Sequence, residues 1–323
     1  MQPSPDIIID QPSREYRLER LCPDTIPHLA QLHAAVYGVK ADERLFREKY
    51  DTAYTGLSCV GYLAYDIAGT PIAFYGVIPC RIWYRGQWML AAQSADTMTH
   101  PQYRLKGMFV DLSEKTFALC RHLGIPLLFG FPNRQSYHGA IHKLGWKMTE
   151  EMVYFKVPAR RSRIGALLKR YRFLSLLYQP YCRRILRRYK SGKAGIANSV
   201  IADGWAGLWR NDEFLEYKKY SASIVLSFGE VQVWLGKKNY NLVGDMAGIT
   251  SENASRVFEQ ISQVIGRLGF TEWQFHGSPG TALYNLFAKR YAQSPSYPAL
   301  FQDFGSPVSP EKIKFTFADI DIF

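Results

Sequence analysis

Apolar and polar residues alternate along short stretches of the first hundred residues, and this period of two is typical of β-strands. The predicted strands cover residues 16–21, 57–65, 72–78, 81–84 and 88–98. Residues 23–37 instead carry apolar positions at helical spacing, with Pro23 in the first turn and Gly38 as a stop signal. A second, short helix is predicted over residues 43–49. Strands joined by Gly-containing turns predict an antiparallel meander in this region.

The period changes after residue 100. Apolar positions from Met108 to Cys120 recur at helical spacing, residues 125–131 form a short and nearly continuous apolar run, and residues 135–144 return to helical spacing. Such a run is typical of a buried parallel strand. The order strand, turn, helix, strand, helix predicts a βαβα unit with a right-handed crossover, whose ligand would lie beyond the carboxyl end of the first strand.

The second half predicts a similar order of elements. Residues 160–193 predict two amphipathic helices separated at Pro180. Further helices are predicted at residues 212–220, 251–268 and 281–291, and strands at residues 223–228, 231–235, 241–246 and 272–275. Residues 315–323 alternate strictly, which predicts a strand added to the sheet. Asp319 and Asp321 would share one face of that strand, either binding an amine or standing as solvated edge charges.

Composition places the chain among ordered globular proteins, since 47% of its 323 residues are hydrophobic and 21% are charged. It contains no apolar run long enough to span a membrane, and its first residues do not resemble a signal peptide, so we expect a cytoplasmic protein. The five cysteines are scattered without a Cys-x-x-Cys pair. We therefore expect reduced thiols and no metal site.

Positive charge is concentrated in one segment. The chain has 40 Lys and Arg against 28 Asp and Glu, yet residues 152–202 hold 13 of the basic residues and no acidic one. This basic belt, centred on residues 160–193, predicts an anionic partner such as a membrane surface or an acyl carrier protein. Nucleic acid is the least favoured partner because no nucleic-acid-binding motif is present. The alternative is a solvated connector whose apolar face packs between the two halves.

The strand-to-helix turn Arg104-Leu105-Lys106-Gly107-Met108-Phe109 carries the main candidate chemistry. The start of a helix leaves backbone N–H groups unpaired at the positive end of the helix dipole, so a turn of this kind can hold a diphosphate. Gly107 permits close approach, and Arg104 and Lys106 add positive charge. The alternative is an ordinary helix entry with a solvated basic turn.

This turn, with the strand over residues 91–99 and the segment over residues 127–146, resembles the GNAT N-acetyltransferase superfamily over about residues 16–157. The family motif is Gln/Arg-x-x-Gly-x-Gly/Ala, from which Phe109 departs at the last position, where it either crowds the diphosphate or points into the core. The resemblance implies acetyl-CoA or another acyl-CoA as co-substrate. The turn residues Arg104, Leu105, Lys106, Gly107, Met108 and Phe109 would bind its diphosphate, and Thr97, Met98 and Thr99 would pair with its pantetheine arm.

The resemblance also assigns residues on the following helix. Asn133 and Ser136 would contact the pantetheine arm, unless Asn133 serves only as a helix N-cap. The tyrosine that often protonates the departing thiolate is replaced by Ile141, and the candidate substitutes are Tyr137, His138 and His142. Asp96 is the first candidate for the general base and His100 the second. The alternative for Asp96 is a polar residue on the solvated face of a strand.

We therefore predict an α/β protein with a mixed, α+β-like sheet and tandem GNAT-like domains. Residues 1–158 would bind the cofactor, residues 159–195 would form a basic helical connector, and residues 196–323 would form a degenerate second domain. That domain has no Arg-x-x-Gly where a cofactor turn would recur, and Ser251 is expected there as an N-cap.

The predicted reaction is transfer of an acetyl or short acyl group from acyl-CoA to a primary amine of an amino sugar, a small amine or a lysine. The amine would attack the thioester directly. The alternatives are an acyl carrier protein as donor and a non-catalytic scaffold. A homodimer is compatible with the sequence, and the basic belt would place the cytoplasmic protein peripherally at the inner membrane surface.

Overall fold

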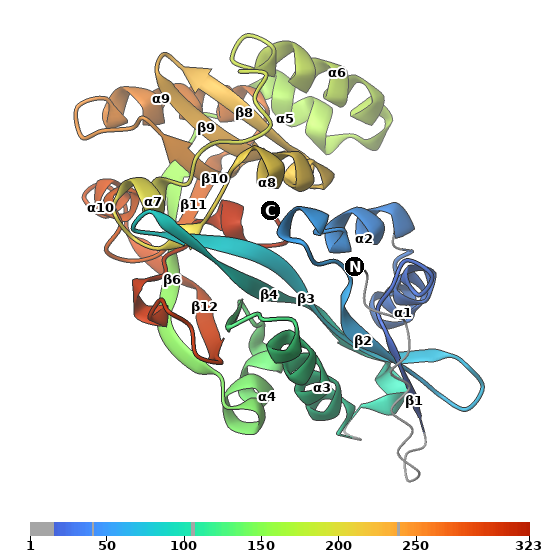
Figure 1. Ribbon diagram of the computed structural model, residues 1–323. Helices are drawn as coiled ribbons and strands as arrows, with labels where there is room; N and C mark the ends of the chain where they lie inside the picture. The colour runs from blue at the N-terminus through green and yellow to red at the C-terminus, as the bar shows by residue number, and fades with distance from the viewer. Residues whose placement is uncertain (1–15, 41, 105–106, 238–239) are drawn as a thin grey trace. The chain divides into compact units, whose positions relative to one another are not determined.

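The computed structural model describes residues 16–40, 42–104, 107–237 and 240–323 (Figure 1). Its contacts divide the chain into two compact units. The first comprises Met1–Arg81, Leu90–Lys147 and Leu300–Ser306, and the second comprises Ile82–Met89, Met148–Ala299 and Pro307–Phe323. The predicted mixed α/β class is confirmed, whereas the domain boundaries at residues 158 and 195 stay a prediction.

The sheet of the first unit has the strand order β1-β2-β3-β4-β5, and the last residues of β12, from Leu300, pair with β5. The strands are β1 (Arg17–Arg20), β2 (Val60–Tyr65), β3 (Pro71–Tyr84), β4 (Gln87–Thr99), β5 (Leu127–Gly130) and β12 (Gln293–Asp303). The first three pair antiparallel, and β5 pairs parallel with β4 but antiparallel with β12. The predicted meander and parallel pair are confirmed, although β3 is one continuous strand where two were predicted.

Four helices accompany this sheet at the predicted places: α1 (Ile26–Tyr37), α2 (Glu43–Tyr50), α3 (Met108–His122) and α4 (Arg134–Leu144). Gly38 and Gly145 end α1 and α4 in the left-handed conformation, as their positions in the sequence indicated. Helix α3 packs against β2 and α4. Its apolar side chains, among them Leu112 and Phe117, join a buried cluster with those of β2 and β3.

The second unit has the strand order β6-β11-β10-β9-β8. These strands are β6 (Lys147–Pro158), β8 (Ser223–Phe228), β9 (Val231–Gly236), β10 (Leu242–Ala247) and β11 (Glu272–Gly277), and a short β7 (Gly207–Leu208) pairs with the end of β3. The helices are α5 (Arg163–Arg170), α6 (Ser175–Leu186), α7 (Ser199–Ala202), α8 (Asp212–Tyr217), α9 (Ala254–Arg267) and α10 (Ala282–Ala288). The parallel pair β10–β11, joined through α9 and followed by α10, repeats the order of β4, α3, β5 and α4.

Two helix boundaries differ from prediction. Pro180 lies inside α6, and the chain instead turns at Tyr171, whose backbone is extended and whose N–H donates to the Leu167 carbonyl in the last turn of α5. Pro180 and Leu176, whose carbonyl would be its helical partner, are both exposed, so water can satisfy that carbonyl. Helix α9 begins after Asn253, and therefore the expected N-cap role of Ser251 is wrong.

The predicted strand at residues 315–323 is also wrong, because the segment contains a 3-10 turn (Phe317–Asp319) closed by a capping box between Thr316 and Asp319. The reason is a buried charge. Asp319 is 1% exposed, and its Oδ1 lies 2.7 Å from Nη2 of the fully buried Arg210. Asp319 is thus committed to an internal ion pair and is not placed to bind an amine.

A buried histidine in the second unit makes the stability of the protein depend on pH. His276 on β11 lies with its Nδ1 2.6 Å from Ser296 Oγ and stacks on Tyr154. Burial lowers the pKa of His276 to about 4. An unfolded histidine titrates near pH 6.5, so the unfolded chain takes up a proton first as the pH falls. Neutral His276 contributes fully to the free energy of unfolding above about pH 6.5, and this contribution is lost as the pH falls toward 4.

We predict that the free energy of unfolding decreases by up to ~3 kcal/mol more between pH 7 and pH 4 in the wild type than in His276→Gln. Urea titrations followed by circular dichroism at the two pH values measure this difference. His142→Gln, which changes an exposed histidine, is the matched control and should behave as the wild type. Parallel pH dependences for the wild type and His276→Gln would contradict the assignment.

Candidate active site

The first turn of α3 has the backbone geometry of an anion site. Gly107 is its N-cap with φ +78°, and the cap makes no side-chain hydrogen bond. The N–H groups of Val110 and Asp111 donate to the Gly107 carbonyl, so the helical bonds begin there and the amides that precede them lie at the positive end of the dipole. A Cβ added to Gly107 would meet no atom within 4 Å, which leaves space against the turn. Leu105 and Lys106 lie outside the described residues.

Phe109, the departure from the family motif, points into the core. Its ring makes an edge contact with Tyr75, the two centroids being 6.2 Å apart. It also lies against Gly139 of α4, where an added Cβ would approach the ring to 2.9 Å. Its neighbour Met108 is buried. Of the two alternatives for Phe109, the structure shows the core position. An anion at the turn would therefore meet backbone N–H groups and not this side chain.

Strand β4 continues past the end of its parallel partner. The register between them ends at Gln93↔Phe129, and β5 stops one residue later at Gly130. Strand β4 runs on to Thr99, and the His100 amide still donates to Ile72 of β3 at 2.8 Å. The predicted pantetheine-binding residues Thr97, Met98 and Thr99 all lie in this extension, with the Met98 side chain buried.

Asp96 precedes this extension and belongs to a mostly buried ion pair. Its Oδ2 lies 2.7 Å from Lys49 Nζ and accepts a hydrogen bond from the Tyr50 hydroxyl at 3.0 Å. The side chain of Lys49 is 8% exposed and that of Asp96 is 20% exposed. The alternative of a solvated strand residue therefore does not describe Asp96. Both contacts use Oδ2, so Oδ1 is the oxygen available to a ligand.

Two further side chains share the electrostatic surroundings of Asp96. Burial raises the pKa of Tyr37, at the end of α1, and the charge of Asp96 raises it further, while Arg104 and Lys49 oppose the rise. Arg104 Nε lies 3.4 Å from the Thr99 carbonyl, a long hydrogen bond that leaves the guanidinium exposed. The carboxyl end of β4 thus combines one carboxylate with two cations and two phenols.

Sequence reasoning missed Tyr37, Lys49 and Tyr50. A signal for two of them was present, because Phe46, Lys49 and Tyr50 stand at positions i, i+3 and i+4 of α2 and so share one face. A lysine on an otherwise apolar helix face indicates a buried acidic partner. Nothing in the spacing of Tyr37 distinguishes it from the other residues of α1.

His100 is held in a local turn. It caps the 3-10 helix Pro101–Tyr103, with its Nδ1 3.4 Å from the Gln102 amide and its ring against Tyr103. The Tyr103 hydroxyl donates to Asp66 at 2.9 Å. His100 therefore has a structural role beside the cofactor turn, and its role as a base stays a prediction.

The candidates on α4 point in different directions. Asn133 caps the helix, accepting hydrogen bonds from the Gln135 and Ser136 amides at 2.9 and 3.0 Å. Tyr137 packs on the hydrophobic cluster that also holds Phe109. His138 and His142 are exposed, and their ring centroids are 4.4 Å apart. Tyr137 is therefore the candidate on α4 whose side chain packs inward, on the same cluster as Phe109.

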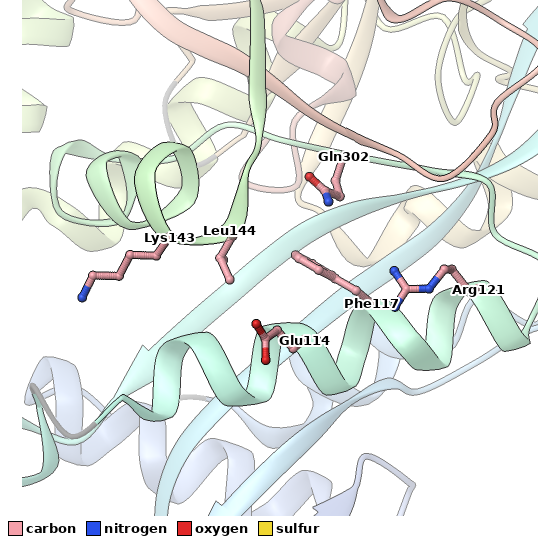
Figure 2. A pocket seen from close by; sticks show the side chains of 6 residues that line it. All are labelled: Glu114, Phe117, Arg121, Lys143, Leu144 and Gln302. Atoms are coloured by element: carbon pink, nitrogen blue, oxygen red, sulfur yellow. The ribbon is translucent and has the colours of Figure 1, made fainter.

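A separate cavity of about 350 Å³ lies between α3, α4 and β12 (Figure 2). It is lined by Glu114, Phe117, Arg121, Lys143, Leu144 and Gln302. None of these residues belongs to the predicted site, so this cavity is distinct from the α3 turn. Within the described ranges, no group of three or more His, Cys, Asp or Glu side chains could hold a metal ion.

Comparisons with known proteins agree with this geometry. Residues 17–149 match the family described as acetyltransferase (GNAT) domain. A GCN5-related N-acetyltransferase from Kribbella flavida is 13% identical with a TM-score of 0.59, the match covering 90% of this chain and 73% of that one. A putative acetyltransferase from Pyrococcus horikoshii is 11% identical with a TM-score of 0.58, covering 98% of both chains. These identities establish the fold alone. No curated protein matches the chain.

The α3 turn can be tested with a pair of variants that match in shape and differ in charge. Aspartate and asparagine both tolerate a left-handed backbone, so Gly107→Asp and Gly107→Asn carry a similar strain of about 1 kcal/mol. Only the aspartate places a negative charge against a bound diphosphate. We expect Gly107→Asp to weaken acetyl-CoA binding by about a hundredfold and Gly107→Asn by less than about fivefold.

Isothermal titration calorimetry with acetyl-CoA measures both affinities, and thermal unfolding checks that the two variants are equally folded. If the two substitutions reduce affinity equally, the diphosphate does not lie at this turn.

Proposed function

We propose that the protein transfers an acetyl or short acyl group from acyl-CoA to a primary amine, because residues 17–149 match the acetyltransferase (GNAT) domain family. The observation that carries the proposal is the arrangement at the end of β4. An uncapped helix start at Gly107 follows a strand that extends beyond its partner, with Asp96 beside it. These features supply an anion site, a strip of unpaired backbone and a carboxylate.

The residues present fit an acyl-CoA donor. Its diphosphate would be held by the amides that follow Gly107, with Arg104 adding charge. Its pantetheine arm would lie along Thr97, Met98 and Thr99. Asn133 uses its carbonyl oxygen as a helix cap, which leaves its side-chain N–H groups as donors at the edge of the same site. The donor supplies a thioester carbon that an amine can attack.

The chain's own residues would bind and move the protons. The acceptor enters as an ammonium ion, which Asp96 would attract through its free Oδ1. Asp96 would then remove one proton from it, directly or through a water molecule. Attack by the neutral amine forms the C–N bond and breaks the C–S bond, so the thiolate leaves with the electron pair and the nitrogen loses its second proton to solvent. We assign the proton that neutralises the thiolate to Tyr137, since His138 and His142 are on the exposed face of α4.

The second unit would support this reaction without binding a second donor. Asp245 stands near the end of β10, the strand parallel to β11, as Asp96 stands in β4. Its carboxylate is fully buried, 2.5 Å from Arg210 Nη1 and 2.6 Å from Ser199 Oγ. The ring of Phe323 packs against Gly244, where an added Cβ would approach it to 2.4 Å. These buried contacts favour a degenerate second domain with a structural role.

A coupled assay tests the proposed activity. Release of free thiol from acetyl-CoA should accelerate when amino sugars, small diamines or lysine peptides are added, and mass spectrometry should find one acetyl group on the preferred amine. Calorimetry separates the alternatives. Acetyl-CoA binding without transfer to any amine would argue for a different acceptor chemistry, and no binding at millimolar concentration would defeat the acyl-CoA proposal in favour of a scaffold.

The role of Asp96 predicts a change in the pH–rate profile. A general base contributes on the order of 10²–10⁴ in rate, so Asp96→Asn should lower kcat/KM by at least about a hundredfold. The pH–rate profile should also change, because the proposed base has been removed. Asp51→Asn, at an exposed carboxylate that ends α2, is the matched control. A slower enzyme with an unchanged profile would show that Asp96 acts only through its ion pair.

A further inference from the structure

Large apolar side chains are exposed together at one place in the second unit. The described residues expose twelve such side chains, and half of them lie within residues 164–177. They are Ile164, Leu167, Tyr171, Phe173, Leu176 and Leu177. Phe173 and Leu176 are 76% and 84% exposed. We call this group the apolar tip; it lies along α5, on the turn that joins the two helices and in the first turn of α6.

The hairpin of α5 and α6 is fixed to the second unit on its other side (Figure 1). Gly165 of α5 lies so close to the end of α9 that an added Cβ would stand 2.2 Å from the Arg267 carbonyl oxygen. The Tyr178 and Tyr181 hydroxyls of α6 donate to carbonyls at the end of α9, each at 2.9 Å. Cys182 is fully buried in the core. The apolar tip is thus displayed on an anchored support and is not a frayed segment.

Positive charge accompanies the apolar tip along the hairpin. Eight arginines of the two helices and their flanks are exposed, namely Arg160, Arg161, Arg163, Arg170, Arg183, Arg184, Arg187 and Arg188. None of them forms an ion pair with a carboxylate in the part of the chain that the structure describes. The sequence contains no acidic residue between Met152 and Ala202 that could neutralise them.

We propose that the α5–α6 hairpin docks on an anionic lipid surface, with the apolar tip at the boundary between headgroups and acyl chains and the arginines on lipid phosphates. Exposed apolar side chains and cations on one hairpin match the two layers of such a surface. An acidic protein or a nucleic acid would satisfy the arginines but would leave six apolar side chains in water. Among the described helices, none is long and apolar enough to cross a membrane, so this contact is interfacial. It does not depend on the acyl-transfer reaction.

Co-sedimentation of the full-length protein with vesicles tests this inference. We expect binding to vesicles of phosphatidylcholine mixed with phosphatidylglycerol, weaker binding to phosphatidylcholine alone, and a loss of binding as sodium chloride is raised. Thermal unfolding and thiol release are recorded in parallel, so that a failure of docking is distinguished from a failure of folding or of transfer.

Two sets of variants separate the apolar and the charged contributions. Replacing Phe173, Leu176 and Leu177 together by serine should lower vesicle affinity by about a hundredfold, because three apolar insertions are lost. Replacing the four arginines Arg183, Arg184, Arg187 and Arg188 by glutamine should lower affinity for anionic vesicles by about fivefold per arginine. Ile67→Ser, at a side chain that is 97% exposed in the first unit, is the control and should leave binding unchanged.

Three results would overturn the inference. The wild type could fail to bind anionic vesicles, or the serine variant could bind as the wild type does, which would show that the apolar tip does not enter the lipid. Binding to purified acyl carrier protein without binding to vesicles would assign the arginines to a protein partner instead.

Discussion

The candidate site depends on the buried ion pair between Lys49 and Asp96. Asp96 has φ +51°, a left-handed conformation in the middle of a strand, which costs on the order of 1–3 kcal/mol. The Lys49 ammonium and the Tyr50 hydroxyl hold its carboxylate in place and so offset this cost. The strain lies just where β4 passes the end of β5. Thr97, Met98 and Thr99, the proposed pantetheine-binding residues, follow directly.

The same order of elements serves different chemistry in the two units. Asp96 keeps one oxygen free and stands before an uncapped helix start, whereas Asp245 of the second unit is enclosed by Arg210 and Ser199. A buried arginine that binds two carboxylates is costly to disturb, since removing one partner leaves an uncompensated charge. The second unit therefore uses its strand-end carboxylate for stability. The functional surface that it keeps is the α5–α6 hairpin, with its exposed apolar and basic side chains.

Most of the first unit could be predicted from local patterns. The period of two in β2 and β4, the helical period of α3 and the glycines after α1 and α4 are local signals, and each element lies where these signals placed it. The α3 turn was proposed as a cofactor site because it combines several such signals with a family resemblance. Long-range contacts escaped prediction. The strictly alternating segment 315–323 turns because Asp319 binds Arg210, more than one hundred residues away in sequence.

The site residues also divide into those set by local signals and those set by long-range contacts. Asn133 as a helix cap follows from its position before α4, and the pattern suggested it. Lys49 and Tyr50 reach Asp96 from α2, and no spacing within β4 indicates such partners. The direction of Phe109 likewise depended on Gly139, whose missing side chain makes room for the ring. For Asp96 and Phe109, the deciding contact joins two elements that lie far apart in the sequence.

A crystal structure of the protein with bound acetyl-CoA would test the central claim most directly. We predict diphosphate oxygens within hydrogen-bond distance of the Met108 and Phe109 amides, the pantetheine arm along Thr97 to Thr99, and the thioester on the side of Asp96 Oδ1. A diphosphate bound elsewhere, such as in the cavity between Glu114 and Lys143, would contradict the claim that the start of α3 is the cofactor site.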